Sequence, residues 1–532
     1  MGLFFDVSDY ETFTFTDDKG VEHQCPIEVE DYEPPKWRRF LGFFWDTWTM
    51  PPVKRHYLQK LDFFIFAYSL ASYIVKALDQ NNFSNAYVSG MSDDLHLMGQ
   101  ERNLFTTLFN MGYLTGSVPN QLMINRIRPS YWIPFCEFIW GVMTMVIAGV
   151  NSARAIYGIR FVAGYFESSA FPSFNLLLGS WYAPEELGKR MALFEMSSSA
   201  ASMFSGYIMT GIYATMNGAH GIAAWRWMFI IDGVITLPIA LIGIYFLPDF
   251  PTTTRAHWMQ PWEKEYGLRR MATLGRKPQK KLTWEGLKEI FLRPTIYVAT
   301  VPYTCQWFAP YTSYFNLWLK ALGTLTVEQI NLIPTGGSGL AVISAYIFPM
   351  ISDRYNCRWP IAIGCSAFGL LGAILLSIWN LPEAVIMFAN IIPNAGAAGQ
   401  PLTVAWMHEN FQNNTELRSM IVGFGNVINY AMTAWLPLVL FPTPSAPHYK
   451  VGYQFSAMFY ALHMISVYLF TFYIRWYHRK HNMVLNEFGL PVQLDEMTEE
   501  GHVVVMRDED MSDEVIMSNE KKPDYTVSVE KS

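Results

Sequence analysis

The chain of 532 residues is 51% hydrophobic, and only 16% of its residues are charged, against about 25% in ordinary soluble domains. This composition excludes an ordinary soluble protein and favours one embedded in a lipid bilayer. The net charge of −7 does not indicate nucleic acid as a partner, because much of the acid lies in the C-terminal tail. The five cysteines show neither CxxC nor Cys/His spacing, so we expect no disulfide framework, no metal site and no cofactor.

Long uncharged stretches predict helices that cross the membrane. Four of them contain no Asp, Glu, Lys or Arg, namely residues 294–319, 359–382, 384–407 and 451–474. Each exceeds the roughly 20 residues that a helix needs to cross the hydrocarbon core. Their hydrophobicity does not alternate from residue to residue, which excludes the strands of a β-barrel.

In chain order, we predict a cytosolic N-terminal arm (1–57), a six-helix bundle (58–247), a basic cytosolic loop (248–294), a second six-helix bundle (295–476) and an acidic cytosolic tail (477–532). The expected helices lie near 61–87, 104–124, 132–150, 156–174, 191–213, 227–247, 296–319, 332–351, 360–379, 384–404, 420–440 and 453–475. The predicted fold class is an all-α polytopic membrane protein with about 12 transmembrane helices in two bundles.

The short loops predict the orientation. If the N-terminus is inside, the inner loops carry most of the Lys and Arg residues, and this bias places both termini in the cytosol. Two inner loops at the same place in each half, Asn125-Arg-Ile-Arg and Asp353-Arg-Tyr-Asn, indicate a weak internal repeat, although basic inner loops alone would also give this likeness. The candidate gating residues are Arg126, Arg128, Asp353 and Arg354.

One apolar stretch, residues 159–172, contains two opposite charges, Arg160 and Glu167. Seven residues are about two helical turns, so both side chains and Gly164 lie near one face of a helix. A charge at mid-membrane costs at least ~2.5–3.5 kcal/mol unless it faces a partner or a wet cavity. The pair therefore indicates a transport path or a binding site. The alternative is a buried Arg–Glu clamp between helices that touches no substrate.

The same region carries a family resemblance. Its motifs are Arg160-Phe161 with Gly164, Glu167 and Pro172, then Trp181-Tyr182, Asn217-Gly218 and Trp225-Arg-Trp-Met-Phe-Ile-Ile-Asp-Gly233. They resemble the first half of the anion:cation symporter family of the major facilitator superfamily, most of all the fungal allantoate, pantothenate, biotin and nicotinate permeases. The resemblance covers roughly residues 61–475 and leaves out both tails. We interpret Gly112-Tyr-Leu-Thr-Gly116 as a helix-packing motif.

The resemblance implies roles for individual residues. Asp79-Gln-Asn-Asn82 stands where the family has Asp-Arg-x-Asn, so the first arginine of the family is Gln80 here. In the family, the acids matching Asp79 and Glu167 are associated with proton coupling. The arginine matching Arg160 is associated with the carboxylate of the substrate, and Gln80 and Asn82 become further substrate-binding candidates.

Lys76 lies one turn before Asp79, so it is a candidate for the missing cation. Alternatively, its stem packs on apolar surface and its amine pairs with Asp79 or Gln80. A substrate that takes over Arg160 would release Glu167 to bind a proton, which assumes that Arg160 and Glu167 are paired.

Amides in the second half are candidates to complete the cavity. They are Gln306, Asn394 and Gln400, with Asn316, Asn426 and Asn429 as further polar positions. Alternatively, such amides bridge helices without touching a ligand.

The predicted function is proton-coupled uptake of a small organic carboxylate by alternating access, with pantothenate favoured. The alternatives are export of a small metabolite, transport of allantoate, biotin, nicotinate or a sulfur-containing acid, and nutrient sensing. An enzyme is not expected, because no nucleophile–base set or His-rich metal box occurs on the spans. The expected partners are the carboxylate, protons and the bilayer, and we expect a monomer in the plasma membrane.

Overall fold

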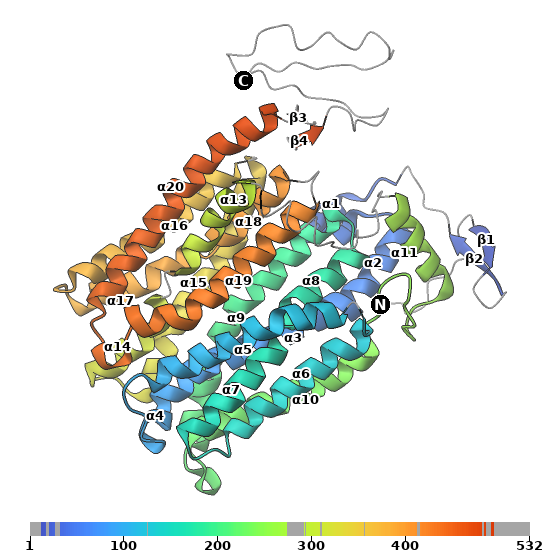
Figure 1. Ribbon diagram of the computed structural model, residues 1–532. Helices are drawn as coiled ribbons and strands as arrows, with labels where there is room; N and C mark the ends of the chain where they lie inside the picture. Colours follow the sequence, from blue (N-terminus) through green and yellow to red (C-terminus); the bar gives the residue numbers. More distant parts are fainter. Residues whose placement is uncertain are drawn as a thin grey trace. The chain divides into compact units, whose positions relative to one another are not determined.

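The computed structural model describes residues 12–16, 21–26, 32–124, 126–273, 292, 294–308, 311–355, 357–411, 415–480, 483–485 and 491–493. Helices dominate these residues (Figure 1). Most of the predicted acidic tail and much of the basic central loop lie outside the described residues. By their internal contacts the residues form two units, one of Met1–Lys281, Asn316–Gly339 and Thr433–Pro447, and one of Leu282–Phe315, Leu340–Met432 and His448–Ser532.

The N-terminal arm contains regular structure that the sequence did not reveal. Strands β1 (Thr12–Thr16) and β2 (Glu22–Pro26) pair antiparallel, and α1 (Lys36–Phe44), the 3-10 turn η2 (Asp46–Thr49) and α2 (Pro52–Leu61) follow. These elements are too short for a hydrophobic period to stand out. Helix α2 continues through the π-helical turn η3 (Asp62–Phe66) into the first membrane helix, α3 (Ala67–Ala86).

The remaining helices of the first bundle follow the predicted order. They are α4 (Ser92–Asp94), α5 (Glu101–Ile124), α6 (Pro129–Ile147), α7 (Ala153–Glu167), α8 (Ala170–Trp181), α9 (Pro184–Met216) and α10 (Ala224–Phe246), with α11 (Pro261–Thr273) in the central loop and the turns η4 (Tyr87–Met91) and η5 (Ala219–Gly221) between helices. Helices α6 and α10 lie side by side, as do α3 and α9 (Figure 1). The predicted helix 156–174 is two helices, because it breaks at Ser168 and Ser169, whose hydroxyls bond the carbonyls of Tyr165 and Phe166 at 2.7 and 2.8 Å.

Small residues bring α5 and α7 into backbone contact. A Cβ on Gly112 would overlap the carbonyl oxygen of Phe161, and a Cβ on Gly116 would overlap that of Tyr165. From the other side, Gly164 of α7 lies against the carbonyl of Phe109. The packing interpretation of Gly112 and Gly116 is confirmed.

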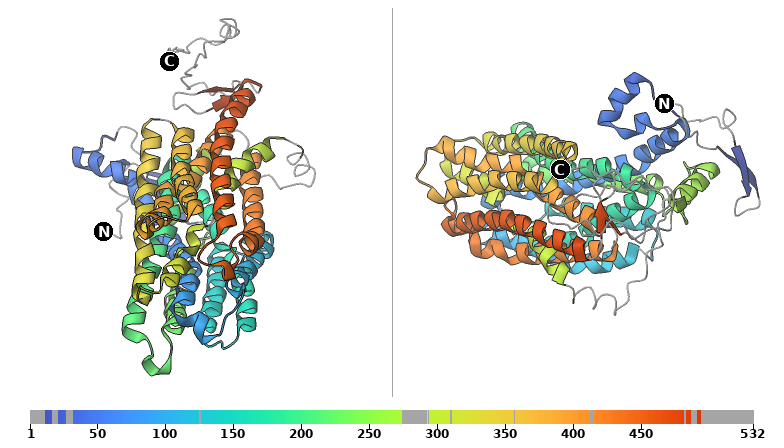
Figure 2. Two further views of the ribbon diagram at one scale, coloured as in Figure 1. Left: turned by 90° about the vertical axis from the view of Figure 1, so that its left-hand side faces the viewer. Right: turned by 90° about the horizontal axis from the view of Figure 1, so that it is seen from above.

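The second unit contains α13 (Pro294–Cys305), α16 (Arg358–Ile378), α17 (Glu383–Ile391), α18 (Gly399–Asn410) and α20 (Lys450–Lys480), and much of α15 (Val327–Arg354) and α19 (Thr415–Leu440). Helices α16 and α20 lie side by side (Figure 2). The predicted helix 296–319 is interrupted by the 3-10 turns η6 (Gln306–Phe308) and η7 (Tyr311–Tyr314) before α14 (Phe315–Leu322). The predicted helix 384–404 is interrupted by η8 (Ile392–Gly396), and η9 (Thr443–Ser445), β3 (Met483–Leu485) and β4 (Pro491–Gln493) complete the described elements.

Parts of α14, α15 and α19 belong to the first unit, and amides attach them to its helices. Asn316 donates to Asn85 at 2.9 Å, and Asn331 donates to Ser89 at 2.8 Å. On α5, Asn103 donates to the carbonyl of Phe441 at 2.7 Å. For Asn316 the structure therefore favours the helix-bridging alternative.

Six helices of the described chain are long and apolar enough to cross a membrane by length and composition. They are Pro52–Asp94, Pro129–Ile147, Ala224–Phe246, Val327–Tyr355, Arg358–Ile378 and Lys450–Lys480. Some other predicted spans are divided by breaks into helices that are too short to cross a membrane alone, as α7 and α8 are.

Candidate functional site

Arg160 is buried in the first bundle and keeps unused hydrogen-bond donors. Its side chain on α7 is 4% exposed, and its Nη1 lies 3.9 Å from Oδ1 of Asp79 on α3. The guanidinium carbon lies 4.4 Å from the ring centre of Phe109 and 4.9 Å from that of Phe83. Neither Nε nor Nη1 has a hydrogen-bond acceptor among the described residues. The aromatic rings thus hold a cation that could receive an anionic ligand.

Asp79 connects this cation to a third helix. Its Oδ2 accepts a hydrogen bond of 2.8 Å from the Thr144 hydroxyl on α6. Both residues are buried. Asp79 therefore has one oxygen satisfied by a neutral donor and one facing Arg160.

Glu167 is fully buried and bonded to the residue that replaces the family arginine. Nε2 of Gln80 donates to Oε1 of Glu167 at 2.5 Å, and Oε2 has no hydrogen-bond partner among the described residues. The seven-residue spacing in the sequence predicts that Glu167 pairs with Arg160. The structure differs, because the carboxylate that forms an ion pair with Arg160 is Asp79, on a neighbouring helix.

Lys76 lies among aromatic rings in the same bundle. Its side chain is 5% exposed, and its amine lies 5.0 Å from the ring centre of Tyr73 and 5.6 Å from that of Tyr113. Its electrostatic interactions are with Glu167 and Glu195. The alternative in which Lys76 pairs with Asp79 or Gln80 does not hold in the structure.

Two acidic residues of this cluster were missed by the sequence reasoning. Glu195 of α9 is half-buried and interacts with Lys76. Asp232 of α10 is 3% exposed, and it interacts with the carboxylates of Asp79 and Glu167 and with the amide of Asn82. A signal for Asp232 was present, since it is the one charged residue in the predicted helix 227–247.

Asn82 has a bridging contact rather than a free amide oxygen. The Ser205 hydroxyl on α9 donates to Oδ1 of Asn82 at 2.6 Å, and Asn85 donates to the same hydroxyl at 2.7 Å. This pair of bonds joins α3 to α9 beside the charged cluster.

The substrate-binding candidates Gln306, Asn394 and Gln400 lie in the second unit. Asn394 of η8 donates to the carbonyl of Ile391 at 3.0 Å, which is a bond within its own turn. The Gln306 amide lies 3.1 Å from where a Cβ of Gly399 would stand, next to the half-buried Gln400. Gln306 thus lies against the first residue of α18, the helix that carries Gln400.

The candidate gating residues differ in their contacts. Arg126 is exposed, and Arg128 is the half-buried residue before α6. Asp353 forms an ion pair with Arg358, which also binds Glu409 at 2.7 Å, so α15, α16 and α18 are linked by charge. The neighbouring Arg354 is exposed.

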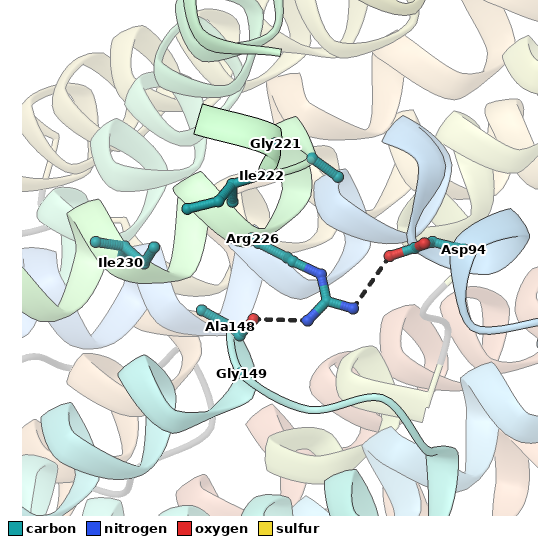
Figure 3. A pocket seen from close by; sticks show the side chains of 8 residues that line it. Asp94, Ala148, Gly149, Gly221, Ile222, Arg226 and Ile230 are labelled. Atoms are coloured by element: carbon teal, nitrogen blue, oxygen red, sulfur yellow. Dashed lines mark hydrogen bonds and ion pairs between the residues drawn. The ribbon is translucent and has the colours of Figure 1, made fainter. Parts of the chain in front are cut away.

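A cavity of about 530 Å³ lies where the loops next to α6 and α10 meet. Figure 3 shows Arg226 at its centre, with one guanidinium nitrogen 2.8 Å from the carbonyl of Ala148 and the other 3.2 Å from Asp94. Arg226 also donates to Val150 and Asn151. Because its terminal nitrogens are engaged by the protein, we interpret Arg226 as a link between loops rather than as a ligand site.

Comparison with known proteins decides the family. The model of the Major Facilitator Superfamily matches residues 69–437. The chain belongs to the major facilitator superfamily. The MFS transporter PfmaC of Pestalotiopsis fici is 33% identical over 76% of this chain and 78% of its own. The pantothenate transporter liz1 of Schizosaccharomyces pombe is 31% identical over 75% of this chain and 78% of its own.

A solved structure agrees in fold. The xylose transporter XylE from E. coli, in a partially occluded inward-open conformation, superposes with a TM-score of 0.57 at 14% identity. The superposition covers 77% of this chain and 97% of the XylE chain. The predicted all-α polytopic fold and the resemblance to the fungal permease branch are confirmed. The major facilitator protein described here is a membrane-embedded transporter of a small molecule, not an enzyme.

Proposed function

We propose that this transporter takes up a small organic anion together with a proton by alternating access. The observation that carries the proposal is Arg160, a buried guanidinium with two nitrogens free of protein acceptors in the described chain, held between aromatic rings and next to Asp79. A guanidinium donates charge-assisted hydrogen bonds to a carboxylate, and these are shorter and stronger than hydrogen bonds between neutral groups.

Pantothenate is the favoured substrate. The chain is similar over three quarters of its length to a pantothenate transporter, and pantothenate is a monocarboxylate. Arg160 would bind that carboxylate, and Lys76 would contribute a second positive charge to the cluster, in place of the family arginine that is Gln80 here. Gln80, Asn82, Gln306, Asn394 and Gln400 stay substrate-binding candidates.

The charge balance of the cluster supports proton coupling. Three acids, Asp79, Glu167 and Glu195, interact with the two cations Lys76 and Arg160. A fourth acid, Asp232, interacts with Asp79 and Glu167 and with neither cation. Buried carboxylates that lie close together cannot all be ionised without a matching cation, so at least one of these groups holds a proton. Asp79 and Glu167 are the proposed coupling residues, and a substrate anion on Arg160 would deprive Asp79 of its cation and favour proton uptake there.

The Lys/Arg bias of the loops supports an orientation with both termini in the cytosol. We propose the plasma membrane as the place of this uptake carrier. We propose that it acts as a monomer with its gates at Arg126, Arg128, Asp353 and Arg354.

The test is uptake of radiolabelled pantothenate into cells that lack their own carrier, at external pH 5 and pH 7. Saturable uptake that is faster at pH 5, abolished by a protonophore and blocked by unlabelled pantothenate would support substrate and coupling together. Uptake of a different acid from a competitor panel would replace the substrate. Failure to transport any acid would overturn the proposal in favour of export or sensing.

A further inference from the structure

Helix α1 presents its apolar side outward. Trp37 and Phe40 are 54% and 67% exposed, and being three residues apart they lie on one side of the helix. The opposite side packs on η2, and the Trp37 ring also reaches this turn, with its centre 6.2 Å from that of Trp48. A Cβ on Gly42 would overlap the Thr49 side chain of η2, and Arg38, one turn before Gly42, donates to the Tyr32 hydroxyl at 2.9 Å. A surface helix in water has the reverse arrangement, with the apolar stripe inward.

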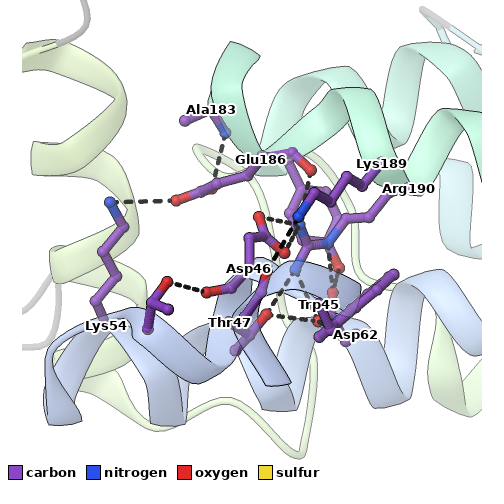
Figure 4. Close-up of polar contacts among 12 residues, drawn as sticks. Trp45, Asp46, Thr47, Lys54, Asp62, Ala183, Glu186, Lys189 and Arg190 are labelled. Atoms are coloured by element: carbon purple, nitrogen blue, oxygen red, sulfur yellow. Dashed lines mark hydrogen bonds and ion pairs between the residues drawn. The ribbon is translucent and has the colours of Figure 1, made fainter. Parts of the chain in front are cut away.

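The segment after α1 is fixed to the first bundle by buried charges. Arg190 at the start of α9 is fully buried and binds Asp62 through Nε at 2.6 Å and Nη2 at 2.8 Å, and Asp46 through Nη1 at 3.1 Å (Figure 4). Trp45 donates to Asp62 at 3.0 Å. Asp46 belongs to η2 and Asp62 begins the turn that leads into α3. The C-terminal end of α1 is therefore held at the foot of the first membrane helix.

The chain that follows α1 exposes a large ring within a candidate span. Phe63 of η3, inside Pro52–Asp94, is 54% exposed. In a membrane-embedded protein such an exposed ring contacts lipid. Trp45, the residue after α1, donates to Asp62, the residue before Phe63, so the C-terminal end of α1 lies close to this lipid-facing part of the chain.

Cations accompany the apolar side of α1. Lys36 and Arg39 are exposed, and the Arg38 guanidinium carbon lies 4.9 Å from the ring centre of Trp37. The nearby acid Glu33 pairs loosely with Arg39 at 3.6 Å. Short helices with aromatic residues on one side and Lys/Arg on the other lie in the membrane interface, and anionic lipids of the cytosolic leaflet attract such cations.

We propose that α1 is an interfacial helix that lies in the cytosolic leaflet, with Trp37 and Phe40 in the acyl boundary and Lys36, Arg38 and Arg39 among anionic headgroups. The arm is then a lipid-binding surface fixed to the transporter by Arg190. This interaction is separate from substrate transport and does not depend on which anion is carried.

The test uses the full chain in nanodiscs, with a spin label on Phe40→Cys and, as the matched control on another side of the same helix, on Arg39→Cys. Both are made in a Cys357→Ser background, because the other four cysteines are buried. We expect the ratio of oxygen to nickel-complex accessibility at position 40 to be several-fold higher than at position 39. Adding phosphatidylserine to phosphatidylcholine should widen the difference, and Trp37→Glu should abolish it.

Equal, water-like accessibility at both positions would overturn the proposal. Exclusion of both reagents from position 40 would also overturn it, since that result indicates coverage by protein. A difference that does not respond to phosphatidylserine would refute the role of anionic headgroups.

Discussion

At the residue scale, Glu167 separates proton coupling from substrate binding. Gln80 already satisfies one oxygen of Glu167 at 2.5 Å, so Glu167→Gln keeps the size and polarity of the side chain but removes the exchangeable proton. We expect uphill accumulation to fall to simple equilibration while exchange of substrate stays within a few-fold of the parent. Uphill accumulation is measured as net uptake against a concentration gradient, exchange is measured as counterflow of labelled substrate, and the two are compared in the same cells. Unchanged uphill uptake in Glu167→Gln would contradict proton coupling at this residue.

Glu137 supplies the matched control for that variant. It is a fully buried acid of the same bundle, and its Oε2 accepts a hydrogen bond of 2.5 Å from the Tyr68 hydroxyl. Among the described residues it forms no ion pair, and its hydrogen-bond partner is Tyr68 rather than a residue of the Arg160 cluster. Glu137→Gln should therefore keep uphill accumulation, which would show that loss in Glu167→Gln is not a general effect of removing a buried carboxyl.

Asp232 is a second candidate residue for proton coupling. It is buried and interacts with the carboxylates of Asp79 and Glu167. Two like charges in a buried site favour a shared proton. In Asp232→Asn this shared proton is lost, so we expect the stimulation of uptake between pH 7 and pH 5 to shrink or disappear. An unaltered pH profile with normal protein levels would assign Asp232 a packing role instead.

At the element scale, hydrophobicity predicts where membrane helices lie but not where they break. The helix positions follow from stretches of about 20 uncharged residues. The breaks at Ser168 and at η8 depend on hydroxyl and backbone bonds that have no hydrophobic signal. Likewise, the seven-residue spacing puts Arg160 and Glu167 on one side of α7, but their partners Asp79 and Gln80 come from another helix.

The contact of α5 with α7 gives a sharp test of helix packing. In Gly112→Ala the new methyl meets the backbone carbonyl of Phe161, which cannot move aside as a side chain would. Overpacking of this kind costs about 1–3 kcal/mol, so we expect a lower thermal midpoint in detergent. Gly158→Ala on α7 is the control, because a Cβ there meets nothing within 4 Å. Equal midpoints for both variants would mean that α5 and α7 are not in backbone contact.

One buried cation, Arg190 of α9, binds acids of both η2 and η3. Arg190→Met leaves Asp62 and Asp46 without their shared partner, and breaking a buried charge pair costs about 3–5 kcal/mol. We expect strong loss of thermal stability, and partial recovery when Asp62→Asn is added. Arg154→Met at the start of α7 removes an exposed cation that has no side-chain partner among the described residues, and should change the midpoint little. If both variants unfold at the same temperature, the Arg190 contacts add nothing to stability.

At the scale of the whole molecule, the loops on one side of the membrane carry the cations, and this asymmetry predicts the orientation. Arg126 lies between α5 and α6 and Ser152 lies between α6 and α7, and both are exposed. Because one helix separates the two loops, they open on opposite sides of the membrane. A membrane-impermeant maleimide should label Ser152→Cys in intact cells, and Arg126→Cys only after permeabilisation.

Native thiols do not obscure this experiment. Burial raises the pKa of the Cys25 thiol to about 11, and since the thiolate is the reacting form, Cys25 should stay unlabelled near pH 7. Cys357, the half-buried cysteine on a predicted inner loop, is replaced by Ser in the background. Labelling of Arg126→Cys in intact cells would show that the orientation is the reverse of the predicted one. It would place the arm, α1 and the Arg190 network outside, where the leaflet offers few anionic headgroups for Lys36, Arg38 and Arg39.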